Sequence, residues 1–259
     1  MCVKQVPDTA NVEVDPVTGV LKRDGTQSKL NPYDLYAMES ALGMKEQQGG
    51  TVDVITMGPG QAREALKECM CMGADRAGLI SDRKFAGADV VATSYTLSQG
   101  IRRMGEYDLI LCGKQTTDGD TAQVGPAMAE HMHIPHAAWV SEIVEVDENS
   151  VCVKQKLGDV TQVSRISYPC LITVDKDICV PRLPSYRLKK KTEGRQIRVL
   201  GFGDLPDQDL SRYGLVGSPT SVERIFPPEK TKEQVWIEGS APQQTDALYQ
   251  LLLRKKFVM

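Results

Sequence analysis

The sequence predicts an α/β protein with a doubly wound, mostly parallel sheet, helices on both faces, an antiparallel hairpin extension and an extended C-terminal arm. From residue 1 to about residue 180, apolar runs typical of buried strands alternate with segments whose apolar residues recur at helical spacing. Repeated strand–helix units of this kind imply a parallel sheet covered by helices on both sides.

The N-terminal part is expected to form a strand, a hairpin and a helix. Residues 2–6 are apolar enough for a strand, and residues 11–23 alternate apolar and polar positions around a Pro/Gly turn. Asn31 suits the N-cap of the next helix, and Pro32 suits its first position. The buried stripe of that helix comprises Leu35, Met38 and Leu42.

Three further strand–helix pairs follow. The expected strands cover residues 51–57, 77–80 and 107–112, and the expected helices lie near residues 62–70, 90–104 and 124–131. Gly73 stands where a C-cap glycine belongs. The run Leu109-Ile110-Leu111 marks the clearest buried strand.

After residue 137 the pattern changes to strands that look antiparallel. These expected strands are residues 150–156, 160–167 and 170–174, with a break at Gly158-Asp159. We expect one α/β domain over residues 1–200. Within it, residues 182–191 are basic and lack periodicity.

The remaining residues, 201–259, are expected to form an arm that docks on another chain. Residues 201–243 are rich in Gly, Pro and charge, so they should bury little by themselves. A short helix that carries Leu248, Leu251 and Leu252 on one face closes the chain.

The composition excludes several classes of function. The net charge of -3 gives no reason to expect nucleic acid or an anionic membrane as partner. No apolar run approaches the roughly 20 residues of a membrane span, and the first residues do not read as a signal peptide. The seven cysteines contain no C-x-x-C pair, which favours a reducing, cytoplasmic location over a disulfide framework.

Three loops are candidates for a ligand site, because open α/β sheets bind ligands beyond the carboxyl ends of their strands. They cover residues 6–8, 57–60 and 113–125. The third is rich in glycine and hydroxyl groups, and the helix N-terminus after it would favour a phosphate. The alternative is an ordinary strand–helix loop. Neither a G-x-G-x-x-G fingerprint nor a Walker A lysine loop is present.

Histidine and cysteine clusters are weak candidates for chemistry. His131 and His133 point to different sides of a helix and Pro135 breaks it before His136, so we predict no metal site. Cys69 and Cys71 diverge by about 200° on a helix, which favours packing over a redox pair.

Several short motifs, in order and spacing, resemble the electron-transfer flavoprotein β subunit over nearly the whole chain. They are CVKQVPD at 2–8, NPYD at 31–34, MGP at 57–59, MGADRA at 72–77, GKQ at 113–115 and PRLP at 181–184. The resemblance implies pairing with an α subunit that holds a flavin, and a nucleotide bound by this chain itself.

By resemblance, the nucleotide contacts lie in the first strand, the turn into the first helix and the candidate loops. These positions are Cys2, Asn31, Pro32, Tyr33, Asp34, Met57, Gly113, Lys114, Gln115, Thr116, Thr117, Asp118, Gly119, Asp120, Thr121, Ala122, Gln123 and Val124.

The family divides by the identity of that nucleotide, which is a structural AMP in simple members. In electron-bifurcating members it is a FAD that accepts a hydride from NADH, with electrons passing to ferredoxin or flavodoxin and, through the α-subunit flavin, to a dehydrogenase. Small residues at Gly119 and Ala122 would leave room for the larger ligand, and residues 17–25 also resemble the bifurcating branch. A side chain should be least tolerated at Gly119, because it would intrude on the ligand or forbid the backbone angle.

The resemblance also implies a docking segment for the partner dehydrogenase. Its residues are Arg182, Leu183, Pro184, Tyr186 and Leu188. A flavin-dependent acyl-CoA dehydrogenase or lactate dehydrogenase would fit as partner, and a solvated basic linker is the alternative for this segment. A nucleotide-binding regulatory module remains the alternative for the whole chain.

Overall fold

The computed structural model describes residues 1–8, 28–176, 178–223 and 235–258 of the chain. Residues 1–223 and residues 224–259 form two compact units, and each is described by itself. The hairpin expected over residues 11–23 lies outside the described residues.

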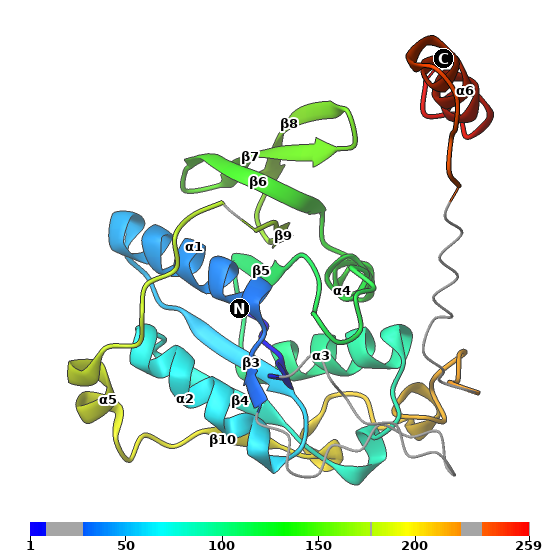
Figure 1. Cartoon of the computed structure of the whole chain (residues 1–259). Coiled ribbons are helices and arrows are strands. Elements are labelled where there is room, and N and C mark those ends of the chain that lie inside the picture. Colours follow the sequence, from blue (N-terminus) through cyan, green and yellow to red (C-terminus); the bar gives the residue numbers. More distant parts are fainter. Residues whose placement is uncertain (9–27, 177, 224–234, 259) are drawn as a thin grey trace. The chain divides into compact units, whose positions relative to one another are not determined.

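A mostly parallel sheet forms the centre of the first unit (Figure 1). One half contains β3 (Asp53–Met57), β4 (Arg76–Ile80) and β10 (Arg198–Leu200), all parallel. The other half contains β5 (Leu109–Gly113), β9 (Cys170–Val174), β6 (His136–Val146), β7 (Ser150–Leu157) and β8 (Val160–Ser167), in that order.

Residues 1–3 join the two halves into one continuous sheet. The Val3 N–H donates to the Ile55 carbonyl of β3, and the Cys2 N–H donates to the Leu111 carbonyl of β5, both at 2.9 Å. The strand expected over residues 2–6 is therefore divided in two. After Lys4 the chain leaves the sheet as β1 (Gln5–Pro7), which pairs antiparallel with β2 (Ser28–Leu30).

Helices cover both faces of the sheet, which confirms the predicted doubly wound fold (Figure 1). One face carries α1 (Pro32–Gln48) and α2 (Arg63–Met72); the other carries α3 (Val90–Met104) and α4 (Val124–Met132). Short 3-10 turns lie at Gly60–Ala62, Arg83–Phe85, Phe202–Asp204 and Leu210–Arg212.

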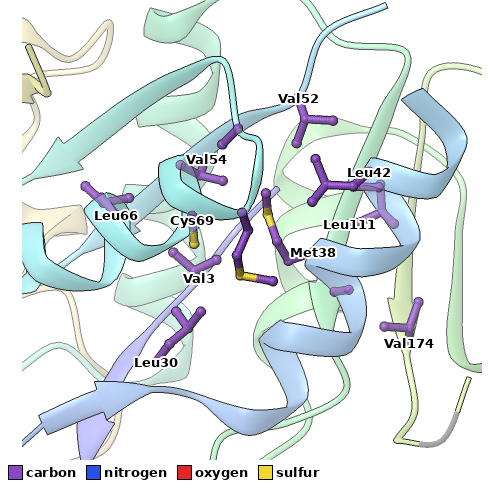
Figure 2. Close-up of a cluster of buried hydrophobic side chains, with 14 of the residues drawn as sticks. Val3, Leu30, Met38, Leu42, Val52, Val54, Leu66, Cys69, Leu111 and Val174 are labelled. Carbon is purple, nitrogen blue, oxygen red and sulfur yellow. The ribbon is translucent and has the colours of Figure 1, made fainter. Parts of the chain in front are cut away.

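Adjacent strand residues supply two separate apolar cores, because side chains alternate across a sheet. Val54 packs with Met38 of α1 and Leu66 of α2, as Figure 2 shows. The next residue, Ile55, packs with Ile101 of α3 and Met128 of α4.

The end of the sheet formed by β6 to β9 is partly antiparallel. β7 pairs antiparallel with both β6 and β8, as expected for residues 150–156 and 160–167. The prediction for residues 170–174 is wrong, because β9 lies between β5 and β6 and is parallel to both. All five residues of β9 are buried, which fits a central parallel strand.

Residues 202–213 are anchored more firmly than the sequence suggests. Phe202, Leu205 and Tyr213 are buried in the core on the α3 and α4 face. The Tyr213 ring stacks edge-on against Phe202 and Tyr95, with centroids 5.3 Å apart in both cases. The expectation that this stretch buries little is therefore wrong here, because its aromatic residues find partners on the α/β body.

Two further helices complete the described residues. The basic segment forms α5 (Tyr186–Thr192), which Ser185 caps by accepting from the Leu188 N–H. In the second unit the expected helix is α6 (Ala241–Arg254), which has no buried residue; at its start the Ser240 N–H and hydroxyl both donate to Gln243 Oε1 at 2.9 Å. None of the described helices combines the length and apolarity that crossing a bilayer requires.

We predict that Tyr213→Ala destabilises the first unit by about 3–5 kcal/mol, since it empties a fully buried aromatic site. Urea denaturation of the purified chain measures the change, and proteolysis should cut near residues 205–220 sooner. Leu210→Ala is the control, because Leu210 is 43% exposed and its loss should cost little. Equal stability of both variants would contradict the packing role of Tyr213.

Candidate functional site

The candidate loops meet at the carboxyl ends of residues 1–3, β3 and β5, where the strand order reverses. The Lys4 ammonium, two residues before the first loop, bonds both carboxylate oxygens of Asp118 in the third loop at 2.8 Å. The Gln5 amide donates at 3.3 Å to the carbonyl of Gln61, which follows the second loop in the 3-10 turn before α2. Residues that flank the first and second loops are thus bonded to each other and to the third loop.

Asn31 ties the start of α1 to the third loop. Its amide nitrogen donates to the Gln115 carbonyl at 2.9 Å, and its amide oxygen accepts from the Thr117 N–H at 3.3 Å. Asn31 stands at the N-cap position but makes no capping bond with its side chain. The expected cap is therefore wrong in its chemistry, because both ends of the amide bond the loop instead. Pro32 does occupy the first turn, as predicted.

Gly113 allows α1 to contact the end of β5 directly. A Cβ atom there would lie 2.4 Å from Asp34 Oδ1 and 2.7 Å from the Tyr33 carbonyl carbon, too close for any side chain. The Asp34 carboxylate accepts from the Lys4 N–H at 2.7 Å and is 4% exposed. Gly113 is thus a glycine that the packing of the protein itself requires, whatever ligand binds.

Asp34 is an unusual acid. Burial raises its pKa to about 7, against the opposing effect of hydrogen bonds from Asn31, Lys4 and Gly113. Because burial disfavours the charged carboxylate, Asp34 titrates near neutral pH at the centre of the junction between α1, residue 4 and β5.

The third loop carries backbone strain at two residues that are not glycine. Asp120 and Ala122 have φ values of 54° and 55°, in the left-handed region. The Asp120 N–H donates to the Thr116 carbonyl at 2.9 Å. Gly119 lies outside that region, and a Cβ atom there would contact only Thr116 Oγ1, at 3.4 Å. The backbone reason given for Gly119 is therefore wrong.

The loop ends at the N-terminus of α4, where N–H groups remain available. Gln123 holds the N-cap position, and no side chain of the described residues caps this end. A Cβ atom on Gly125 would lie 2.4 Å from Thr173 Cγ2, so the first turn packs directly on β9. Free N–H groups at a helix N-terminus are suited to a phosphate.

Cys2 and Met57 lie in the strand segments that lead into the first and second candidate loops. Cys2 is buried, and a hydrogen bond between its thiol and that of Cys112 lowers the pKa of Cys2 and raises the pKa of Cys112. Met57 is the half-buried last residue of β3. No sequence pattern indicated Lys4 as a link between loops, or Trp139 and Asp175 as contacts of Lys114.

The predicted docking segment lies apart from these loops, against α1 and α2. Arg182 forms ion pairs with Glu39 at 2.8 Å and Glu46 at 2.6 Å, and these bonds raise the pKa of Arg182. Arg182 therefore holds the segment in place. Leu183 and Tyr186 are 87% and 73% exposed, whereas Leu188 is half-buried and Pro184 is exposed.

The histidines take structural positions. His131 stacks edge-on against Tyr95, with ring centroids 5.2 Å apart, and burial lowers its pKa. His133 ends α4 in the left-handed conformation, and His136 begins β6. Within the part of the chain that the structure describes, no three His, Cys, Asp or Glu side chains are grouped so as to hold a metal ion.

A doubly wound sheet with its loops gathered where strand order reverses is the architecture in which α/β proteins bind nucleotides. Residues 18–200 match the model of the electron transfer flavoprotein domain. The chain belongs to the electron transfer flavoprotein family and is similar to its β subunits.

Three relatives illustrate the similarity. The electron transfer flavoprotein subunit beta of Clostridium acetobutylicum is 44% identical over 224 residues, which are 86% of this chain and 85% of the relative. Protein FixA of Azorhizobium caulinodans is 38% identical over 99% of this chain and 94% of its own length. The caffeyl-CoA reductase–Etf complex subunit CarD of Acetobacterium woodii is 39% identical over 100% of this chain and 98% of its own.

We predict that Asp34 makes the stability of the protein depend on pH. The folded state keeps the proton up to about pH 7, whereas an unfolded aspartate loses it near pH 4. The free energy of unfolding therefore has its full contribution from protonated Asp34 below about pH 4. This contribution declines as the pH rises towards 7, by at most about 1.4 kcal/mol per pH unit.

The measurement is urea unfolding of the unmodified chain and of Asp34→Asn between about pH 5 and pH 8. The stability of the unmodified chain should fall relative to that of the variant up to about pH 7, and the difference should then be constant. Parallel pH profiles for the two proteins would show that Asp34 titrates normally.

Proposed function

We propose that this chain is the β subunit of an electron-bifurcating electron transfer flavoprotein, which pairs with an α subunit and binds FAD at the three joined loops. When bound, FAD would supply the two-electron chemistry with NADH and the one-electron steps to ferredoxin or flavodoxin. The second route leads through the α-subunit flavin to a flavin-dependent acyl-CoA or lactate dehydrogenase. The location is then the cytoplasm.

The observation that carries the nucleotide site is the junction of the third loop with α4. The N–H groups of Val124 and Gly125 at the start of α4 suit the pyrophosphate, because they can donate hydrogen bonds to its oxygens; Pro126, the next residue, has no N–H. Gly119 meets only Thr116 Oγ1 within 4 Å, so the loop is open on the side of Gly119. The polar chain positions from Gln115 to Gln123 would hold the rest of the nucleotide.

Two small residues of the third loop and the name of one relative support the bifurcating assignment. Small residues at Gly119 and Ala122 would leave room for a ligand larger than AMP. A relative that matches almost end to end, CarD, is named as a subunit of a caffeyl-CoA reductase–Etf complex, which favours an acyl-CoA dehydrogenase type of partner. The alternative is a simple one-flavin carrier, in which the same loops would hold a structural AMP. A regulatory module is disfavoured by the family to which the chain belongs.

The arm is the proposed contact with the α subunit. In α6, Leu248 is 48% exposed and Tyr249 is 49% exposed, while Leu251 and Leu252 are half-buried. An amphipathic helix with no buried residue has an apolar face that a partner can cover. We assign residues 1–200 to the nucleotide domain and the chain beyond them to the arm, of which residues 202–213 are fastened to the nucleotide domain.

We predict two flavins in the purified αβ pair and one after Gly119→Val. The Gly119 position has no φ value that forbids a side chain, and the one atom near its Cβ position is Thr116 Oγ1 at 3.4 Å, so the protein should fold and the added branches should obstruct mainly the ligand. Flavin stoichiometry and bleaching by NADH measure the effect. The control is Gly203→Val, since Gly203 also has no atom within 4 Å of its Cβ position and lies in a different turn.

An unmodified pair that holds one flavin and AMP, and that does not react with NADH, would overturn the bifurcating assignment. Gly113→Ala gives a contrast, because it should disturb the contact with Asp34 and reduce stability as well as nucleotide content.

We predict that Leu183→Ala or Tyr186→Ala weakens electron delivery to the partner dehydrogenase about tenfold or more, with flavin content unchanged. Both side chains are exposed on a segment that Arg182 fixes to α1, so they are presented in a defined place. Steady-state kinetics with the cognate dehydrogenase measure the effect. Val160→Ala, on the exposed edge strand β8, is the matched control. Unchanged kinetics would assign the segment to a plain linker.

A further inference from the structure

Trp139 has a strained backbone at the same edge of the sheet as the candidate loops. Its φ value is 60°, which a residue with a large side chain rarely adopts. The pairing of β6 with β9 shifts between Ala137 and Val140, so Trp139 lies in a β-bulge. Bulges of this kind redirect a side chain and recur beside functional sites.

The bulge is held by specific bonds. The Trp139 N–H donates to Thr173 Oγ1 at 3.0 Å, and the Gln155 amide donates to the Ala138 carbonyl at 2.9 Å. The same Thr173 contacts the first turn of α4 through its methyl group, at the position of Gly125. Thr173 therefore connects the bulge to the helix N-terminus proposed for the pyrophosphate.

The indole of Trp139 is brought beside Lys114, the first residue after β5. The Lys114 ammonium lies 4.7 Å from the centre of the indole ring and 3.0 Å from the Asp175 carboxylate. Lys114 also donates its N–H to the Val174 carbonyl at 2.8 Å, which fixes its main chain to β9. Trp139 nevertheless remains 37% exposed, so part of its ring surface is open.

The two sides of the third loop are thus held differently. Asn31 of the α1 side bonds the main chain at Gln115 and Thr117, whereas Lys114 and Gly125 rest on β9 beside the bulge. An adenosine half on the α1 side, with its phosphate at α4, would leave the Trp139 side without a contact. A dinucleotide has a second ring system that continues past the pyrophosphate.

We propose that Trp139 and Lys114 form a stacking subsite for the planar ring of the second half of the dinucleotide. This subsite rests on the proposed function, because it needs FAD in this subunit. The indole supplies a flat aromatic surface. The Lys114 ammonium lies over one face of the ring and is paired with Asp175, so the ligand ring would stack on the other face. Trp139 is therefore a residue that distinguishes a dinucleotide from AMP.

The experiment uses the αβ pair with Trp139→Ala, Trp139→Phe and, as the matched control, Val144→Ala, which shortens an exposed apolar side chain on the same strand β6. Loss of the stacking surface in Trp139→Ala should weaken FAD binding in this subunit about tenfold or more, while AMP binds as before. Trp139→Phe should retain most of the affinity but raise the flavin fluorescence, because phenylalanine stacks without quenching. Val144→Ala should change neither quantity.

The outcomes separate the two proposals. If the unmodified pair binds FAD in this subunit and Trp139→Ala leaves FAD affinity and fluorescence unchanged, the subsite is wrong and the proposed function stands. If FAD and AMP affinities fall together, Trp139 supports the fold of the site and the subsite is also wrong. If the unmodified pair holds AMP only, the proposed function itself fails.

Discussion

The structure depends on the hydrogen bonding of residues 1–3 between β3 and β5. Without these bonds the sheet would consist of two separate halves, because β3 and β5 each pair with this short segment rather than with each other. The segment also sets where the strand order reverses, and with it where the loops meet. The position of residues 1–3 in the sheet therefore determines which edge of the sheet is the candidate ligand site.

The next level of organisation is a junction of buried polar groups above that segment. Asp34, Asn31 and Gly113 bring the start of α1 against the end of β5 so closely that no side chain fits at Gly113. Buried polar groups cost free energy unless they are bonded, and here the carboxylate and the amide each bond main-chain groups of another loop. The polar side chains at this edge thus have a structural role, because they hold the segments of the candidate site together.

Much of the fold could be predicted because it rests on periodicity and on local signals. Pro32 and Gly73 mark helix ends as predicted, and the apolar runs at β3, β4 and β5 mark buried strands. The partners of a strand are a long-range property, so the parallel pairing of β9 could not be deduced from residues 170–174. Likewise, no local pattern indicates that Tyr213 packs against Phe85 and Tyr95.

The sequence predicted which loops form the candidate site, but it did not predict the hydrogen bonds that link them. The resemblance to the family indicated Asn31 and Gly113 for the candidate site, but the capping role expected of Asn31 is replaced by bonds to residues 115 and 117. Because the Asn31 side chain bonds the third loop, it does not cap α1, and at the start of α4 the N-cap residue Gln123 makes no side-chain capping bond either. Polar side chains thus link the loops to one another, while main-chain N–H groups at the start of α4 keep no side-chain partner among the described residues, an arrangement suited to an anion.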